Sequence, residues 1–289
     1  MFKNKTSCPN CLEQIDCLDV YCPNCQKENT DYKDNHLSKF ALNVSFTFQI
    51  IFFVIGWLGF QILSFLVEIT YAAIFNLNAE TLELSKNLGP IMFITYSLLL
   101  MIFVIMLASS NNLKKAVVPF KHGSTYAAGA IAFAAILTAS MLYSVILQAI
   151  YPVEDNTNQS AIIEVTKLYP IFSLLVFAII GPICEELTYR VGLFGFFKRI
   201  NRVLAWIISI LIFAFIHFDF GAFVSLARDG NNVPLITELL NIPSYIIGAS
   251  GLIFIYERYG FGASTFAHIL NNSYSLIMII ISQYVTVQA

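Results

Sequence analysis

Three groups of polar and ionisable side chains lie at four-residue spacing within apolar segments of the carboxyl-terminal half of the chain. They read Glu185-Glu186-x-x-x-Arg190, Phe213-x-x-x-His217 and His268-x-x-x-Asn272. A carboxylate with imidazoles can orient and deprotonate a water molecule, and imidazole and amide N–H groups can stabilise an oxyanion. Ionisable groups inside a membrane span are costly unless they are paired or face water, so they indicate a function. This pattern is typical of a hydrolytic site.

Helix geometry separates the roles of the two adjacent glutamates. Glu186 and Arg190 are four residues apart, so they share a helix face and can neutralise each other. Glu185 is rotated about 100° from that face and is the carboxylate left free for chemistry. Along the helical rise, Glu185 lies roughly 18 Å and His217 roughly 21 Å from the cytosolic ends of their segments, and the third group about 10–20 Å. We therefore expect these side chains to converge inside the bilayer.

Two other interpretations of these residues stay open. A single histidine in an apolar helix is more often structural than catalytic, although three groups in three segments favour a common site. Glu185, His217 and His268 could also bind a catalytic zinc ion, since two histidines and a carboxylate form a suitable ligand set. Because the chain contains no HExxH sequence, we favour the metal-free hypothesis.

A second chemical site is indicated near the amino terminus, where two identical Cys-Pro-Asn-Cys knuckles occur. They supply four thiolates, the preferred ligands of structural zinc; the thiolates belong to Cys8, Cys11, Cys22 and Cys25. The duplicated spacing resembles a short zinc ribbon, and so small a segment needs a metal ion for its stability. The rival hypothesis is a pair of redox-active disulfides, which a reducing cytosol disfavours. Cys17 is predicted to be a free thiol.

The composition places most of the chain in a lipid bilayer. Of the 289 residues, 57% are hydrophobic and only 12% are charged, which is not the balance of a soluble protein. The formal net charge of −2 argues against a nucleic-acid partner, because such a partner requires a basic surface. The residues up to Lys39 are mostly polar, so we expect no cleavable signal peptide.

Seven apolar runs approach the roughly 20 residues that a helix needs to cross the hydrocarbon core. They lie near residues 43–67, 89–108, 125–149, 171–197, 203–218, 235–256 and 262–282. The fifth run is short, and we expect its helix to extend past His217. We also expect a kinked or re-entrant element within residues 43–76. The chain is thus divided into a head at residues 1–27, a linker at 28–42 and a transmembrane helical domain at 43–289.

The distribution of basic residues predicts the orientation in the membrane, because cytoplasmic loops retain positive charge. With the amino terminus inside, the outer segments hold only Lys86, Lys167 and Arg228. The inner segments then hold Lys3, Lys5, Lys27, Lys33, Lys39, Lys114, Lys115, Lys121, Lys198, Arg199, Arg202 and Arg258. We predict a cytoplasmic head and, from seven crossings, an external carboxyl terminus.

The three polar groups, in this order and in three apolar segments, resemble the motifs of the CPBP (Abi) family of CAAX proteases and bacteriocin-processing enzymes. The resemblance covers about residues 125–282 and departs at Val191, where the family usually has glycine. It implies an all-α bundle of seven to eight helices that hydrolyses a peptide bond without a covalent intermediate or a catalytic cofactor. In that scheme Glu185 and His217 activate water, and His268 and Asn272 stabilise the oxyanion. Glu186 with Arg190 supports the helix.

We therefore expect an all-α, polytopic transmembrane bundle preceded by a small zinc-ribbon-like head. The predicted function is an intramembrane endopeptidase of the CAAX type, acting on a membrane-associated peptide or protein in the plasma membrane of a bacterium. Structural zinc in the head is the one cofactor expected, and the head is expected to contact a protein partner. The alternative function is a non-catalytic membrane protein for bacteriocin immunity or peptide sensing.

Overall fold

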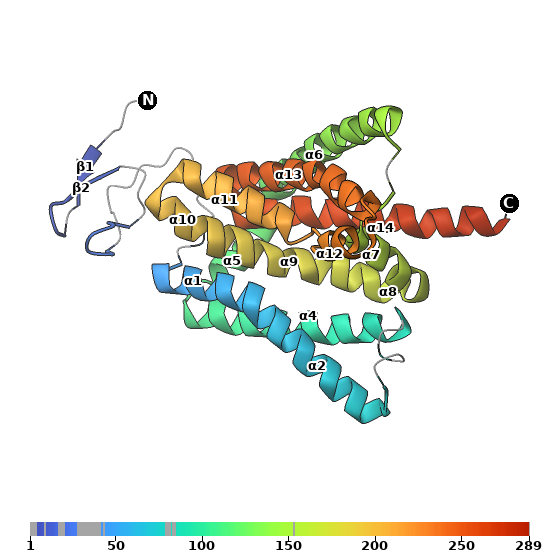
Figure 1. Ribbon diagram of the computed structural model, residues 1–289. Coiled ribbons are helices and arrows are strands. Elements are labelled where there is room, and N and C mark those ends of the chain that lie inside the picture. The colour runs from blue at the N-terminus through green and yellow to red at the C-terminus, as the bar shows by residue number, and fades with distance from the viewer. Residues whose placement is uncertain are drawn as a thin grey trace.

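The computed structural model describes residues 5–8, 10–16, 21–27, 42, 44–78, 82, 85–152 and 154–288. A bundle of helices follows a small two-stranded head at one end of the molecule, and the carboxyl-terminal end of the last helix lies at the other end (Figure 1). The predicted all-α fold class is confirmed. Cys17 and the linker, except Leu42, lie outside the described residues.

The head is built on two copies of one local structure. Strands β1 (Lys5–Ser7) and β2 (Gln14–Asp16) pair antiparallel on either side of the first cysteine knuckle. In each knuckle the residue after the second cysteine has a positive φ, 62° at Leu12 and 58° at Gln26. Its amide donates to the carbonyl of the first cysteine, at 2.9 Å in the first knuckle and 2.8 Å in the second. Both turns therefore aim their thiols the same way.

Six helical segments of the described residues are long and apolar enough to cross a membrane, and the chain is a multi-pass membrane protein. The segments are Phe46–Phe75, Lys86–Ser109, Gly123–Ile150, Pro170–Ile200, Val233–Tyr259 and Phe261–Gln283. The first contains α1 (Phe46–Val54), η1 (Ile55–Gly59) and α2 (Phe60–Phe75), and the second and third are α4 (Ser85–Ser109) and α6 (Gly123–Ile150). The last two are α13 (Val233–Tyr259) and α14 (Phe261–Gln288).

Shorter elements complete the bundle and connect the long helices. They are α5 (Leu113–Val117), the 3₁₀ turn η2 (Val118–Lys121), α7 (Thr157–Leu168), α11 (Arg202–Phe215) and α12 (Gly221–Asp229). The fifth predicted run corresponds to α11, which ends before His217, so the expectation of a helix extending past this histidine was wrong. Its 14 residues rise about 21 Å. The chain then turns, and a side chain of α13 accepts a hydrogen bond from the amide of Asp219 in this turn.

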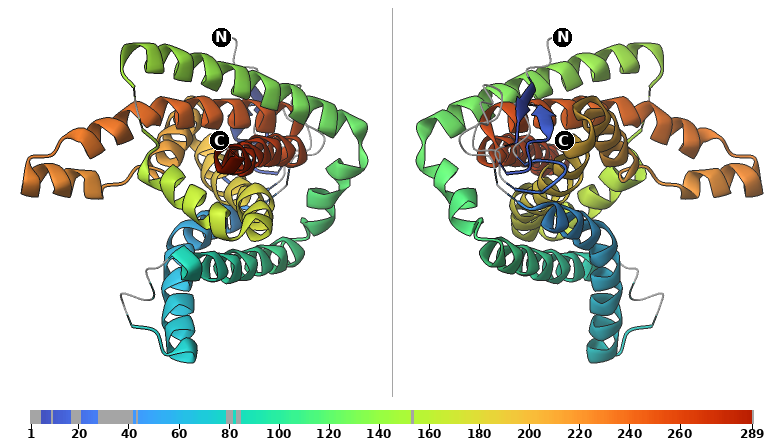
Figure 2. Two further views of the ribbon diagram at one scale, coloured as in Figure 1. Left: turned by 90° about the vertical axis from the view of Figure 1, so that its right-hand side faces the viewer. Right: turned by 90° about the vertical axis from the view of Figure 1, so that its left-hand side faces the viewer.

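The segment Pro170–Ile200 lies in the middle of the bundle and is π-helical over much of its length (Figures 1 and 2). It contains α8 (Pro170–Ser173), η3 (Leu174–Ile180), α9 (Gly181–Glu185), η4 (Glu186–Phe194) and α10 (Gly195–Ile200), of which η3 and η4 are π-helices. The depths estimated from the sequence used the rise of an α-helix for this segment. The wider π turn is frequent at functional sites because it displaces side chains from regular spacing.

Two glycines allow the first membrane helix to approach this central helix closely. A Cβ atom at Gly192 would lie 2.8 Å from the backbone nitrogen of Phe53, and one at Gly56 would collide with the Thr188 side chain. The predicted kink within residues 43–76 corresponds to the π turn η1, within one continuous 30-residue helical segment. Helix α6 packs against both α13 and α14 on another side of the bundle (Figure 2).

Arg199, at the end of the central helix, joins the head to the membrane domain. Its Nε donates to Gln49 Oε1 at 2.6 Å, and its Nη2 donates to the Val44 carbonyl at 2.8 Å. The guanidinium carbon also lies 4.7 Å from the centre of the Tyr21 ring, directly before the second cysteine knuckle. The head is thus in contact with the helix that carries the first polar group.

Candidate active site

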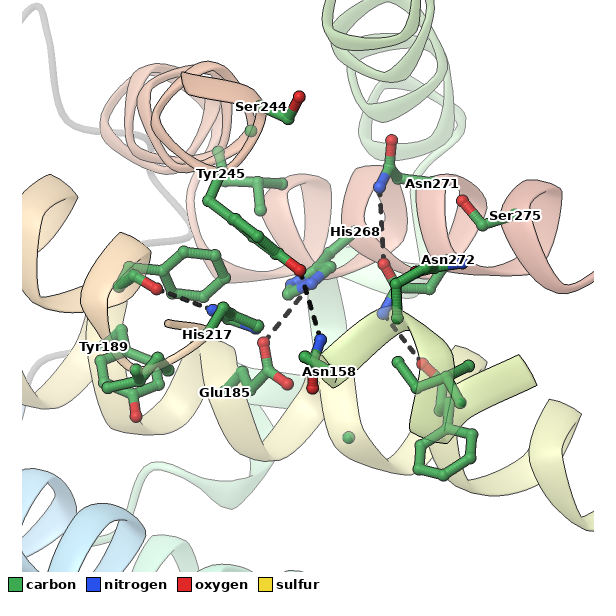
Figure 3. A pocket seen from close by; sticks show the side chains of 18 of the residues that line it. Asn158, Glu185, Tyr189, His217, Ser244, Tyr245, His268, Asn271, Asn272 and Ser275 are labelled. Atoms are coloured by element: carbon green, nitrogen blue, oxygen red, sulfur yellow. Dashed lines mark hydrogen bonds and ion pairs between the residues drawn. The ribbon is translucent and has the colours of Figure 1, made fainter. Parts of the chain in front are cut away.

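A pocket of about 1130 Å³ opens between the central helix and the surrounding helices. Glu185, His217, His268 and Asn272 all line it, although they come from α9, the turn after α11, and α14 (Figure 3). The convergence predicted from helical rise is therefore present. Glu186 and Arg190 do not line the pocket but lie fully buried behind it.

Glu186 is the centre of a buried hydrogen-bond network. Arg190 Nε lies 3.5 Å from Glu186 Oε1, so the ion pair expected from their spacing forms even in the π-helical segment. The Ser264 hydroxyl from α14 donates to the other carboxylate oxygen. His268 Nδ1 lies 3.0 Å from Glu186 Oε1. These contacts engage both carboxylate oxygens and fix α14 against the central helix.

His268 connects the two adjacent glutamates. Because its Nδ1–H donates to Glu186, its Nε2 is directed to the opposite side, 3.6 Å from Glu185 Oε2. The Glu185 side chain is 21% exposed and faces the pocket, whereas His268 is almost fully buried. Sequence spacing gave Glu185 no partner. The helix-to-helix contact supplies one, and a proton can be shared between the imidazole and this carboxylate.

Arg190 is held by an aromatic ring as well as by Glu186. Its guanidinium carbon lies 4.5 Å from the centre of the Phe213 ring, a cation–π contact. The same ring meets His268 edge-on, with centroids 6.1 Å apart. Phe213 therefore separates the buried arginine from the pocket, which explains why the second group pairs a phenylalanine with a histidine.

His217 is oriented by a backbone carbonyl of α11 and by an aromatic ring of α13. Its Nδ1 donates to the Phe213 carbonyl at 2.8 Å, so a neutral ring leaves Nε2 as the basic nitrogen. The ring stacks on Tyr245, with centroids 4.5 Å apart and planes inclined by 18°. The Tyr245 hydroxyl accepts from Asn156 at 3.1 Å and from Asn158 at 3.3 Å.

The turn that carries His217 is fixed by a buried acid on α13. Glu238 is 3% exposed and accepts hydrogen bonds from the backbone amides of Thr157, at 3.0 Å, and Asp219, at 3.1 Å. Tyr245, Asn156 and Glu238 were not predicted as site residues. An acid within the apolar run near residues 235–256 and the Asn-Thr-Asn sequence at residues 156–158 were available signals, but neither identifies a partner.

Asn272 has a structural contact that its spacing did not predict. At the end of η3 the Gly181 amide donates to the carbonyl of Val176, five residues earlier in the chain. In the same π-helical pattern, residue 182 would donate to the carbonyl of Phe177. Pro182 has no N–H and leaves that carbonyl free. Asn272 Nδ2 donates to it at 2.9 Å. One of the two amide protons of Asn272 is thereby used to join α14 to the central helix, and the other stays available.

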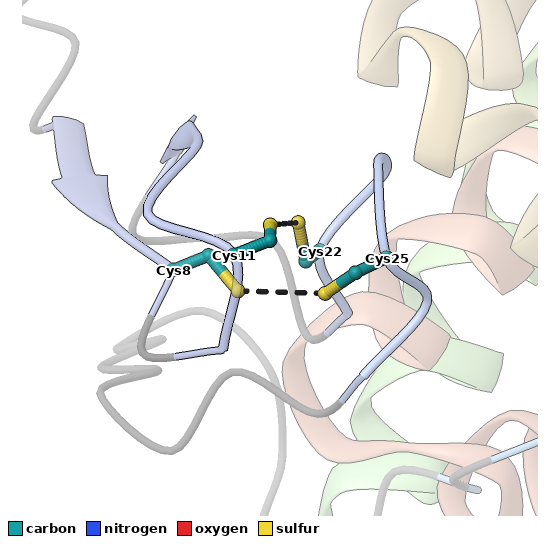
Figure 4. A group of neighbouring side chains, drawn as sticks. All are labelled: Cys8, Cys11, Cys22 and Cys25. Carbon is teal, nitrogen blue, oxygen red and sulfur yellow. Dashed lines mark hydrogen bonds between the residues drawn. The ribbon is translucent and has the colours of Figure 1, made fainter.

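The four cysteines of the head form the second candidate site (Figure 4). Their sulfur atoms all lie within 4.8 Å of one another, with Cys8 and Cys25 at 3.6 Å and Cys11 and Cys22 at 3.4 Å. Four sulfurs at 2.3 Å from a tetrahedral ion lie about 3.8 Å apart, so the cluster fits such an ion. Burial raises the pKa of Cys8, but hydrogen bonds from Asn10, Cys11 and Cys25 outweigh burial and lower the pKa to about 6.

Comparison with protein families agrees with the position of the pocket. Residues 167–274 match the family model described as type II CAAX prenyl endopeptidase Rce1-like. The matched segment contains all three polar groups and lies within the predicted core at about 125–282. This segment is a domain of that family.

Three bacterial relatives align with parts of the chain. Identity is 38% over 98 residues to the membrane-embedded CAAX protease MroQ of Staphylococcus aureus (strain USA300), which is 31% of this chain and 39% of the relative. The UPF0177 protein YvdC of Lactococcus lactis is 30% identical over 87 residues, which cover 30% of this chain and 33% of the relative. An uncharacterized protein of Mycoplasma capricolum is 29% identical over 200 residues, which cover 64% of this chain and 54% of the relative. The alignments thus cover between 33% and 54% of the relatives' lengths. No solved structure matches the chain.

Proposed function

We propose that the protein is an intramembrane endopeptidase that hydrolyses a peptide bond of a membrane-associated peptide or protein. The observation that carries the proposal is the shared pocket of Glu185, His217 and His268, with His268 Nε2 at 3.6 Å from Glu185 Oε2. Titratable groups that meet in one cavity of a membrane protein are functional by default. The family match over residues 167–274 supports the same class of reaction.

Glu185 is the general base in this proposal. Its carboxylate takes a proton from a water molecule that His217 Nε2 helps to orient, and the water oxygen bonds to the carbonyl carbon of the substrate. His268, protonated at both ring nitrogens, donates from Nε2 to the resulting oxyanion, together with the free amide proton of Asn272. Glu185 then returns the proton to the leaving amine as the C–N bond breaks. Glu186, paired with Arg190, accepts from His268 Nδ1 and thereby orients the ring so that Nε2 is directed to Glu185.

A catalytic zinc ion held by Glu185, His217 and His268 is the competing mechanism. Among the described residues, the one group of three or more metal-ligand side chains with ligand atoms within 4.8 Å is that of the cysteines. His268 also directs its two nitrogens to two different carboxylates. Both observations favour the metal-free mechanism. A variant without residues 1–39 separates the two, since chelation of this variant removes activity under the zinc mechanism alone.

The test of the proposal is Glu185→Gln, which removes the base and preserves the shape of the side chain. We expect purified Glu185→Gln to cleave a membrane peptide about 10²–10⁴ times more slowly than the wild type. The matched control is Glu164→Gln, an exposed carboxylate on α7. Equal rates for the wild type and Glu185→Gln would dispose of the catalytic assignment and favour a peptide-binding role.

For the head we propose a structural zinc ion bound by the four cysteines. The support is the tetrahedral spacing of the sulfur atoms and the two equivalent turns that present them. A four-cysteine site leaves no coordination position for a substrate, so its contribution is to fold the head. We also propose that the head is cytoplasmic, as the distribution of basic residues predicts. Cysteine labelling of intact cells tests this topology.

A further inference from the structure

The pocket around Glu185 is lined by both apolar and polar side chains but contains no lysine or arginine among the described residues that line it. Its carboxylates are Glu185 and Asp155. Uncharged polar side chains from α6, α7, α13 and α14 form much of one wall. They include Ser144, Asn158, Asn241, Ser244, Asn271 and Ser275, some of which are drawn in Figure 3. The lining can therefore donate hydrogen bonds to a peptide but has no fixed cation for an anionic group.

The nearby positive charges are already matched. Arg190 is fully buried behind Phe213 and pairs with Glu186, so it does not reach the cavity. A proton on His268 is balanced by two carboxylates, Glu186 at 3.0 Å and Glu185 at 3.6 Å. His217 uses Nδ1 on the Phe213 carbonyl. None of these groups offers an uncompensated charge to a substrate carboxylate.

The lack of a free cation in the pocket limits how close the scissile bond can lie to the carboxyl terminus of a substrate. In a C-terminal C-a-a-X motif, three residues follow the cysteine. Three extended residues span at most about 11 Å, so cleavage directly after that cysteine would hold the terminal carboxylate within the cavity. There it would meet Glu185 and Asp155 without a cation, and an unpaired charge in such a site is costly.

We infer that this pocket selects internal peptide segments that are neutral or cationic near the scissile bond and rejects a free carboxylate within three residues of it. The substrate class is a membrane peptide cut at a distance from its carboxyl terminus, with uncharged polar residues that match the serine and asparagine wall. This inference rests on the proposed function and specifies the substrate of the same site.

The test uses three peptides and the purified full-length protein in detergent. The first is an S-farnesyl peptide that ends in a C-a-a-X motif with a free carboxylate. The second carries a terminal carboxamide instead, and the third is extended by six uncharged residues. We expect kcat/KM for the amide and the extended peptides to exceed that for the acid by at least about tenfold. Equal cleavage of the acid and amide forms, or preference for the acid, overturns the inference even if Glu185→Gln is inactive.

Binding separates this inference from the proposed function. If the wild-type protein cleaves none of the three peptides, the endopeptidase proposal fails, and the Kd of each peptide for the wild type is measured instead. Tighter binding of the amide than of the acid by at least about tenfold then supports the inference. Equal or tighter binding of the acid, or binding of none of the three, overturns it.

A charge placed in the wall provides the second variant. Ser244→Lys introduces a cation into the lining, and Ser244→Gln is the neutral control of similar reach. We expect Ser244→Lys to reduce the amide-to-acid ratio by at least about fivefold relative to Ser244→Gln, because the cation can pair with the carboxylate. The same ratio in both variants would contradict the electrostatic origin of the selectivity.

Discussion

The cysteine head and the membrane pocket show two different ways in which a sequence encodes a site. In the head, four side chains of one type lie within 18 positions of the chain, from Cys8 to Cys25, and their turns repeat the same hydrogen bonds. In the pocket, the side chains are paired between helices: Glu185 with His268, His217 with Tyr245, and Asn272 with the Phe177 carbonyl. Glu185 and Glu186 are adjacent in sequence, yet one faces the cavity and the other lies buried against Arg190. Local spacing thus sets equivalent roles in the head, whereas helix packing sets unequal roles in the pocket.

The largest expected effect concerns the equivalence of the four cysteines. Each of Cys8→Ser, Cys11→Ser, Cys22→Ser and Cys25→Ser should lose bound zinc and unfold the head. A structural zinc ion contributes on the order of 10 kcal/mol to such small domains. Metal content and protection of residues 1–27 from protease are the measurements. If one cysteine can be replaced without loss of zinc, the four cysteines are not equivalent ligands. Asn24→Ser, a substitution within the second knuckle that keeps all four cysteines, is the control.

The next effect concerns the contact of His268 with both glutamates. His268→Ala removes the bridge and should lower the rate of peptide cleavage by about 10²–10³, as loss of an oxyanion donor does. His122→Ala, an exposed histidine before α6, is the control. A loss as small as that of the control would show that the buried bridge serves packing alone and would remove His268 from the proposed mechanism.

The stability of the pocket should depend on Arg190 more than on any exposed arginine. Arg190→Leu leaves Glu186 buried without its cation and should lower the free energy of unfolding by about 3–5 kcal/mol. Arg228→Leu removes an exposed ion pair with Asp229 and should cost less than about 1 kcal/mol. Thermal unfolding in detergent compares the two variants. Equal shifts in Tm would mean that the buried pair adds nothing beyond a surface pair.

The smallest effect concerns Tyr245, which positions His217. Tyr245→Phe keeps the stacked ring but loses the hydroxyl that accepts from Asn156 and Asn158, so we expect a three- to tenfold loss of kcat, or about 1 kcal/mol. The dependence of kcat on pH should shift as well, because Tyr245 orients the imidazole ring of His217, which can take up a proton. Tyr143→Phe loses a hydroxyl that donates to the Leu240 carbonyl and should leave the pH profile unchanged.

Much of the fold could be read from the chain alone. The apolar runs predict the six long helices because about 20 apolar residues are needed to cross the bilayer. The end of α11 before His217 was not predicted, and the turn that follows is held by a residue distant in sequence, Glu238 of α13, which accepts from the Asp219 amide. The π-helical form of the central segment was missed as well, because residue types do not distinguish π from α turns.

The sequence by itself determined which side chains are available for chemistry: the cysteine spacing defines a candidate metal site, and three polar groups in apolar segments define a candidate intramembrane site. Only the tertiary structure decided their pairing. It joined His268 to both glutamates, Tyr245 to His217 and Asn272 to the carbonyl that Pro182 leaves free. The physical reason is that helical spacing fixes neighbours within one helix, whereas the contact between two helices depends on how their faces pack.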